Sequence, residues 1–132
     1  MERFNELDEL VSALYGLTRA CQMKLPNAEQ AIVEIAKLRD YSLNATHEEG
    51  KHKARVFASA LGIGADDAHW LREKLLEAVV GYECVRGRST LFGQRYVLEF
   101  PLTKGRQETR VRSVWNVRPG ETVPRLITCY VL

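Results

Sequence analysis

The sequence contains no uninterrupted apolar stretch that approaches the roughly 18 residues needed for a membrane-spanning helix. It opens with acidic residues instead of the positive start of a secretory signal peptide, so neither membrane association nor export is predicted. Cysteines are few: Cys21, Cys84 and Cys129 are the only ones, and their spacing is not that of a zinc site. Free thiols in a reducing cytoplasm are the simplest expectation.

Several motifs that carry well-known chemistries are missing as well. The sequence has no glycine-rich phosphate loop, no dinucleotide-binding fingerprint and no nucleophile elbow. The spacing of the three histidines, His47, His52 and His69, does not require a metal. We therefore expect neither a cofactor nor a metal centre.

The length of 132 residues and the hydrophobic content of 45% fit one folded domain. Apolar residues recur at intervals of three and four between residues 4 and 17, which is typical of an amphipathic helix. We assign residues 1–22 to an N-terminal helical extension and residues 23–132 to a single α+β domain. The apolar stripe of residues 4–17 offers a surface for a homodimer.

Three further helices are predicted in the first half of the domain. Asn27 can cap a helix that covers residues 28–35 and extends toward residue 40, and a polar loop then spans residues 41–50. Another helix covers residues 51–61, and the last one begins near residue 66 and ends near Gly81.

The pattern changes to alternation after Gly81. Strands are predicted at residues 82–86, 94–102, 108–117 and 125–132, with a first turn at Gly87–Ser89. Short connections imply that consecutive strands are antiparallel neighbours. The fold class is therefore α+β, with N-terminal helices packed on a C-terminal, mostly four-stranded meander sheet.

Charge is unevenly distributed along the chain. Residues 86–125 contain nine Lys or Arg and three Glu, a net charge of +6, whereas residues 1–22 carry a net charge of −2. A basic sheet of this kind favours a polyanionic partner such as RNA. A solvated sheet face beside an acidic helix is an equally good interpretation.

The densest polar cluster lies where the loop leads into the helix at residue 51. His47 and His52 are candidates for proton transfer, and Lys53 is a candidate for electrostatic stabilisation of a transition state. Lys51 and Arg55 can neutralise phosphates near the helix N-terminus. The alternative is a solvated loop followed by a basic helix face.

A second group of polar residues lies on the predicted sheet. Arg110 and Arg112 share one strand face, and Arg125 opens the neighbouring strand. Arg112 and Arg125 are candidates for electrostatic stabilisation of the charge that develops on the phosphate, and Arg110 is a candidate for binding the nucleic acid. Cross-strand ion pairs with Glu99 or Glu108 are the alternative.

The last predicted strand contributes two hydroxyl groups. Thr128 and Tyr130 are predicted to share a face with Leu126, which favours burial, while their hydroxyls could position a substrate at the edge of the sheet. Trp115 alternates with Val111 on the preceding strand and is assigned to the core.

From about Met23 onward the chain resembles a bacterial family catalogued only as a domain of unknown function. The stretches that carry this resemblance are KLPNAEQAIV, KLRDYSLN with His47, GKHKARVFASALG, VRSVWNVRPGE and PRLITCY. Members of the family are small proteins or modules often encoded beside a small partner, so the resemblance implies an arrangement like a toxin–antitoxin pair.

The predicted architecture is also loosely similar to the barnase–EndoU–colicin–RelE group of RNase toxins. If the two polar groups described above face one cleft, their residues match metal-independent cleavage of RNA, with a base for the ribose 2′-hydroxyl and an acid for the departing 5′-oxygen. We therefore expect an endoribonuclease with a small antitoxin-like partner. A non-catalytic module that binds RNA or protein is the alternative, and dimerisation through residues 4–17 is a third interpretation.

Overall fold

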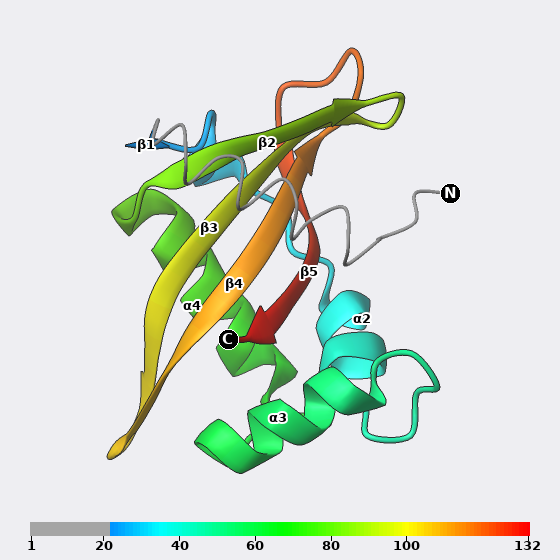
Figure 1. The fold of residues 1–132 in the computed structure, drawn as a ribbon, viewed down its shortest axis with the longest axis vertical. Coiled ribbons are helices and arrows are strands. Elements are labelled where there is room, and N and C mark those ends of the chain that lie inside the picture. Colours follow the sequence, from blue (N-terminus) through cyan, green and yellow to red (C-terminus); the bar gives the residue numbers. More distant parts are fainter. Residues whose placement is uncertain (1–21) are drawn as a thin grey trace.

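The computed structural model describes residues 22–132, in which helical segments precede an antiparallel sheet (Figure 1). The strands are β1 (Gln22–Met23), β2 (Cys84–Thr90), β3 (Gly93–Lys104), β4 (Gln107–Val117) and β5 (Pro124–Val131). The helical segments are the 3₁₀ turns η1 (Ala28–Gln30) and η3 (Ala65–Asp67), the π-helical turn η2 (Leu38–Ser42), and the α-helices α2 (Ile35–Lys37), α3 (Lys51–Leu61) and α4 (Ala68–Gly81). Within these residues the predicted α+β class is confirmed.

The sheet of the described residues has five strands in the order β1-β2-β3-β4-β5, not the predicted four. The additional strand, β1, pairs Gln22 with Val85 and Met23 with Cys84. A strand of two residues is too short to show the alternation from which strands are predicted. Apart from Gln22, the helical extension predicted over residues 1–22 lies outside the described part of the chain.

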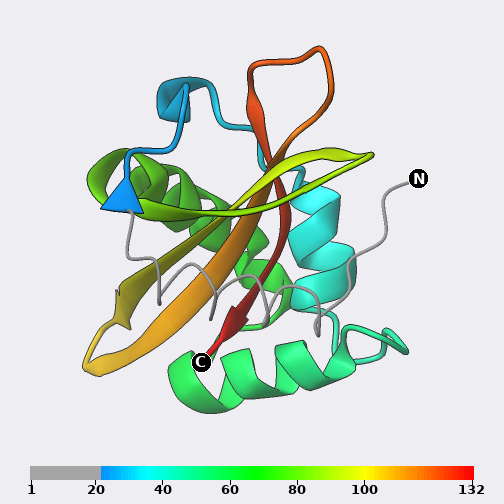
Figure 2. The same ribbon diagram turned by 45° about the horizontal axis from the view of Figure 1, so that its top comes forward.

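The predicted turn at Gly87–Ser89 is wrong, because β2 continues through these residues to Thr90. The chain reverses immediately afterwards, where Thr90 Oγ1 accepts the N–H of Phe92 at 3.0 Å. Gly93 follows with a φ of 130°, and a Cβ there would overlap the carbonyl oxygen of Val117. The position that requires glycine is thus 93, at the start of β3. Figures 1 and 2 show this hairpin and the β4–β5 connection at the same end of the sheet.

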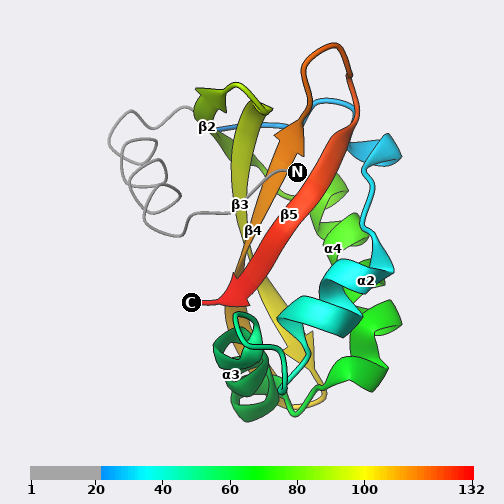
Figure 3. The same ribbon diagram turned by 90° about the vertical axis from the view of Figure 1, so that its right-hand side faces the viewer.

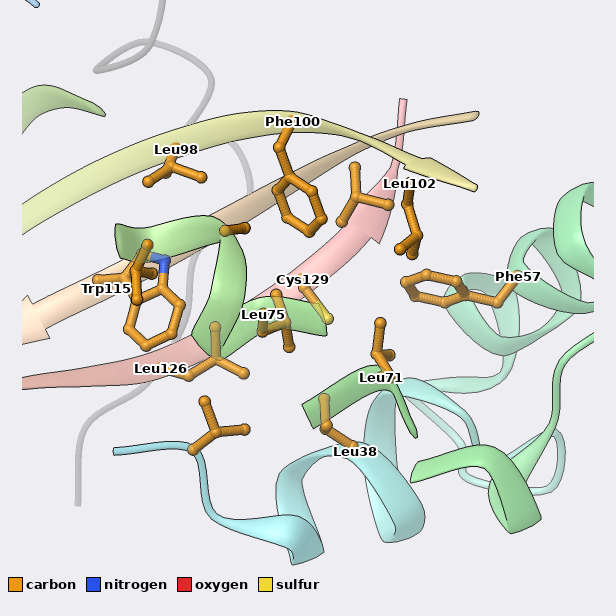
Figure 4. Close-up of a cluster of buried hydrophobic side chains, with 14 of the residues drawn as sticks. Leu38, Phe57, Leu71, Leu75, Leu98, Phe100, Leu102, Trp115, Leu126 and Cys129 are labelled. Atoms are coloured by element: carbon orange, nitrogen blue, oxygen red, sulfur yellow. The ribbon is translucent and has the colours of Figure 1, made fainter. Parts of the chain in front are cut away.

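One face of the sheet carries the hydrophobic core (Figure 4). Leu71 and Leu75 of α4 are fully buried, and Phe57 brings α3 into the same cluster. Trp115 of β4 is also fully buried, and its Nε1 donates to Ser113 Oγ at 2.9 Å, which satisfies the one polar atom of the indole ring. Figure 3 shows α2 and α4 over this face, which we call the inner face, and we call the opposite one the outer face.

The single helix predicted for residues 28–40 is interrupted, because residues 31–34 are extended. In this stretch Ile32 pairs with the edge of β5: its N–H donates to the Pro124 carbonyl at 2.9 Å, and its carbonyl accepts the Leu126 N–H at 2.9 Å. Backbone groups need partners when they are buried. Here the strand edge supplies the partners that a continuous helix would have supplied internally.

The two later helices agree with the prediction from the sequence. Helix α3 covers Lys51–Leu61 and ends where Gly62 adopts a φ of 66°, the usual left-handed termination. Helix α4 follows η3 directly and ends at Gly81. No helix in residues 22–132 is both long enough and apolar enough to cross a membrane.

Asn27 is the only non-glycine residue with a positive φ, 52°, in residues 22–132, and its Nδ2 donates to the Thr122 carbonyl at 2.8 Å. We expect Asn27→Ala to lower the free energy of unfolding by about 1–2 kcal/mol, because it strains the left-handed backbone and removes that hydrogen bond. Asn27→Gly tolerates the same φ and should cost less. Equal losses for the two variants in urea unfolding would contradict this explanation.

Candidate active site

A buried lysine lies between two tyrosines from different parts of the chain. Lys53, on the first turn of α3, is only 8% exposed. Its Nζ lies 3.4 Å from the Oη of Tyr41 in η2 and 5.0 Å from the centre of that ring. The same Nζ lies 5.7 Å from the centre of the Tyr130 ring in β5. Both rings can stabilise the ammonium group, because the face of an aromatic ring attracts a cation.

Arg112 of β4 also contacts Tyr130. Its Nε and one Nη both donate to Glu99 Oε2, at 2.8 and 2.7 Å, and its other Nη donates to Tyr130 Oη at 3.4 Å. Burial lowers the pKa of Arg112, but the hydrogen bonds to Tyr130 and Glu99 outweigh this and raise the pKa above its usual value. Arg112 is therefore charged. Its ion pair with Glu99 is one of the two cross-strand ion pairs that the sequence offered as the alternative. We call Tyr41, Lys53, Glu99, Arg112 and Tyr130 the Lys53 cluster.

A β-bulge decides which face of the sheet Tyr130 occupies. The predicted sharing of one face by Leu126, Thr128 and Tyr130 is wrong, because the β4–β5 register shifts between Val114 and Trp115. Leu126 therefore opposes Trp115 in the core, whereas Thr128 opposes Val114 on the outer face with Tyr130. The Thr128 hydroxyl is buried and has no hydrogen-bond partner among the described residues. The additional residue in β5 thus places Tyr130 on the same face as Arg112, which it opposes.

His47 contacts the Lys53 cluster from the loop that precedes α3. Its Nδ1 accepts the backbone N–H groups of Glu49 and Gly50, each at 3.0 Å, and its ring lies edge-on to Tyr41 with centres 4.8 Å apart. A neutral histidine with Nδ1 as acceptor carries its proton on Nε2. The lone pair needed by a general base is thus already used. The geometry suits a positioning role at the start of α3.

The remaining candidates on α3 lie apart from the cluster. Lys51 is half-buried, and His52 and Arg55 are exposed. Residues one or two positions apart do not share a helix face, so none of the three faces the same side as Lys53. The structure therefore does not bring His47 and His52 together as an acid–base pair around Lys53.

Two of the sheet arginines also lie apart. Arg110 is exposed on β4. Arg125 lies roughly 15 Å from Tyr130 along β5. It forms ion pairs with Glu34 at 3.9 Å and Glu121 at 3.5 Å, near the opposite end of the strand.

Tyr41 is not among the site residues that the sequence predicts, and Glu99 is predicted only as an ion-pair partner. The position of Glu99 could have been found from the sequence. If Lys104 and Gln107 pair across the turn between β3 and β4, the antiparallel register places Glu99 directly opposite Arg112. Tyr41 was assigned to a loop, but it lies in the π-helical turn η2. No local pattern indicates that this turn packs against α3.

The two cysteines of the described chain are buried thiols. Burial raises the pKa of Cys84 to about 11 and that of Cys129 to about 12, although Ser42 and Lys53 act in the opposite direction on Cys129. Both are protonated at neutral pH and are poor nucleophiles. In the described part of the chain, no three His, Cys, Asp or Glu side chains gather as metal ligands would.

The Lys53 cluster falls inside a known family domain. Residues 24–132 match DUF6883, a domain of unknown function. No curated protein and no solved structure matches the chain. Because the match covers most of the sequence, the chain belongs to the DUF6883 family.

Proposed function

We propose that the Lys53 cluster is the active site of a metal-independent endoribonuclease. The observation that carries the proposal is the approach of two cations, Lys53 and Arg112, to the hydroxyls of Tyr41 and Tyr130, at 3.4 Å each. Cations and hydroxyl groups held together in this way suit a phosphodiester, whose non-bridging oxygens accept several charge-assisted hydrogen bonds. The resemblance to toxin–antitoxin-like proteins supports a cytoplasmic toxin that a small antitoxin-like partner neutralises.

The reaction begins with attack of the ribose 2′-oxygen on the adjacent phosphorus. A substrate phosphate that binds Arg112 competes with Glu99, whose carboxylate then takes the 2′-hydroxyl proton. Lys53 and Arg112 stabilise the negative charge on the non-bridging oxygens. Tyr130 donates its proton to the 5′-oxygen as the P–O bond breaks, which leaves a 2′,3′-cyclic phosphate. Proton exchange with water then restores Glu99 and Tyr130.

In this scheme the proton-transfer roles predicted for His47 and His52 belong to Glu99 and Tyr130. His47 acts as a positioning residue, because it holds the start of α3 and packs against Tyr41. Helix α3 in turn presents Lys53 to the substrate. His52 has no part in the scheme.

Removal of a single hydroxyl group tests the proposal with little disturbance of the fold. We expect Tyr41→Phe and Tyr130→Phe each to slow cleavage of total bacterial RNA in EDTA by about 10- to 100-fold, because the first variant loses a polar contact to the reacting phosphate and the second loses the proton donor for the 5′-oxygen. Tyr82→Phe is the matched control, since Tyr82 is 43% exposed and lies beside Phe100, away from the cluster. Equal losses in all three variants would contradict the assignment.

A non-catalytic RNA-binding module is the second candidate, and one observation favours it. Arg112 is already engaged with Glu99 through two hydrogen bonds, as a structural ion pair would be. A folded wild-type protein that binds RNA at low salt but leaves it intact after long incubation would support this candidate over the enzyme. Its affinity should then fall steeply with rising salt, because release of counterions from RNA drives such binding.

A further inference from the structure

Two large apolar side chains form the turn between β2 and β3. Leu91 is 93% exposed and Phe92 is 48% exposed. They make up the whole connection, because β2 ends at Thr90 and β3 begins at Gly93. Turns of two residues between antiparallel strands normally consist of glycine, asparagine or aspartate. Apolar side chains that are exposed in place of these residues are typical of a contact with another molecule.

Hydrogen bonds fix the backbone of this turn, which Figures 1 and 2 show at one end of the sheet. Thr90 Oγ1 accepts the N–H of Phe92 at 3.0 Å, and the Phe92 carbonyl accepts Asn116 Nδ2 at 2.8 Å. A turn that is fixed before binding loses little conformational entropy when a partner buries its side chains. Leu91 and Phe92 therefore form a preorganised apolar anchor, which we call the hairpin tip.

A groove of about 230 Å³ lies between α4 and the second half of β3. Tyr82, which directly follows α4, lies beside Phe100 with ring centres 6.2 Å apart, and Leu102 continues this apolar lining. Glu77 borders the groove on the helical side. Pockets that hold cofactors or drug-sized ligands usually measure about 300–1,000 Å³. The groove is smaller, so it suits a side chain of another protein better than a small molecule.

The hairpin tip and the groove carry opposite charges. Residues 84–98, which include the tip, contain three arginines and no acidic residue. Residues 73–83, which include the helical side of the groove, contain three glutamates and one lysine, a net charge of −2. Complementary charges of this kind favour encounter of the two surfaces and fix their orientation.

The hairpin tip cannot reach the groove of its own chain. Leu91 precedes Phe100 by nine residues, and β3 is extended over nearly all of this stretch. Nine extended residues span roughly 30 Å. A contact between the tip and the groove therefore joins two molecules.

Two other partners suit the hairpin tip less well. The bases of RNA stack on aromatic rings, but the more exposed residue of the tip is a leucine. A lipid bilayer would bury only two side chains, which is less apolar area than that of a myristoyl chain, and one such chain binds membranes only marginally.

We propose that the hairpin tip of one chain inserts into the groove of a second copy of the chain. Leu91 then packs against Tyr82 and Phe100, and the arginines around the tip approach Glu77. Because the contact joins two different surfaces, each pair keeps one open tip and one open groove, and the assembly grows from head to tail. This assembly does not depend on the proposed ribonuclease activity.

Substitutions on the two surfaces test the contact in the full-length protein, by sedimentation velocity over a range of concentrations. The wild-type chain should associate with a dissociation constant of roughly 10–100 μM and exceed the mass of a dimer. Leu91→Asp should weaken association by about 30-fold or more, because a charge replaces the apolar anchor. Glu77→Arg should weaken it by about fivefold or more, because it places a cation opposite the arginines of the tip.

An equimolar mixture of the two variants gives the sharpest result. The Leu91→Asp chain keeps an intact groove, and the Glu77→Arg chain keeps an intact tip. The mixture should therefore form a one-to-one dimer with about the wild-type affinity, although neither variant associates by itself at the same concentration. It should not grow beyond the dimer, because the remaining tip and the remaining groove are both altered.

Two matched variants control for the change in charge. Leu132→Asp repeats the first substitution at a leucine that is 52% exposed at the end of the chain, and Glu48→Arg repeats the second at an exposed glutamate in the loop before α3. Both should associate like the wild type. Far-UV circular dichroism should show that all four variants keep their secondary structure, since every substituted side chain is at least half exposed.

Three outcomes would overturn the proposal. A wild-type chain that stays monomeric up to about 1 mM would mean that the tip has no binding site on a second copy. Association that persists unchanged in both variants would assign it to another surface, such as the apolar stripe of residues 4–17. A mixture that forms no dimer, although the wild type associates and both variants do not, would mean that the tip and the groove do not bind each other.

Discussion

Lys53→Met should remove most RNA cleavage and leave the fold stable. We expect a loss of about 10³-fold in rate, because the ammonium group lies against both tyrosine rings and, in the proposed mechanism, shares with Arg112 the stabilisation of the charge on the phosphate. Methionine keeps the length and the apolar contacts of the side chain. Since burial of a charge is itself costly, the free energy of unfolding should change by less than about 1 kcal/mol.

Initial cleavage rates in EDTA and urea unfolding of the same preparations check both parts of this expectation. Lys74→Met is the matched control, because Lys74 is a partly exposed lysine on α4 that contacts Trp70 and Glu77 and lies outside the cluster. If Lys53→Met destabilises the protein by about 3–5 kcal/mol, Lys53 is part of a buried charge pair that supports the fold. In that case the loss of activity would say nothing about catalysis.

The elements that could be predicted from the sequence are those whose pattern is set locally. Helix α4 places Leu71 and Leu75 at helical spacing against the core, and β4 alternates Val111 and Trp115 with polar residues. In each case one face of the element is buried, so apolar residues recur with the period of a helix or of a strand. Neither element needs information about a distant partner to be recognised.

The errors concern elements whose shape depends on a distant segment. Residues 31–34 are extended because Ile32 pairs with β5, which is almost a hundred residues away in the sequence. The bulge in β5 follows from its register with β4, and β1 exists only as a partner of β2. Secondary-structure propensity and hydrophobic periodicity are local properties of a segment, so they cannot indicate its pairing with a distant strand.

The same distinction applies to the candidate site. Lys53, Arg112 and Tyr130 were selected by chemical type, and the structure places them together with Tyr41 and Glu99. The polar residues between His47 and Arg55 are neighbours in the sequence and were expected to contribute to one site. On a helix, however, the side chains of consecutive residues point in different directions. His52 therefore lies apart from Lys53, although the two are consecutive in the sequence.

The position of Tyr41 depends on Gly50, where η2 packs against the start of α3. A Cβ at Gly50 would overlap the Tyr41 carbonyl oxygen and lie 2.9 Å from its carbonyl carbon. The φ of Gly50 is −86°, which any residue adopts, so space alone is the reason for glycine here. We expect Gly50→Ala to lower the free energy of unfolding by about 2–3 kcal/mol. Cleavage should fall about 100-fold, since Tyr41 must move away from Lys53.

Gly81→Ala is the matched control, because a Cβ at the last residue of α4 meets nothing within 4 Å and alanine restricts the unfolded chain. Urea unfolding and RNA cleavage of the two variants separate a general effect of alanine from the local overlap at Gly50. Since Gly50→Ala and Tyr41→Phe act on the same side chain, the double variant should lose less activity than the product of the separate losses. Full additivity would mean that Gly50 supports the fold without placing the Tyr41 hydroxyl.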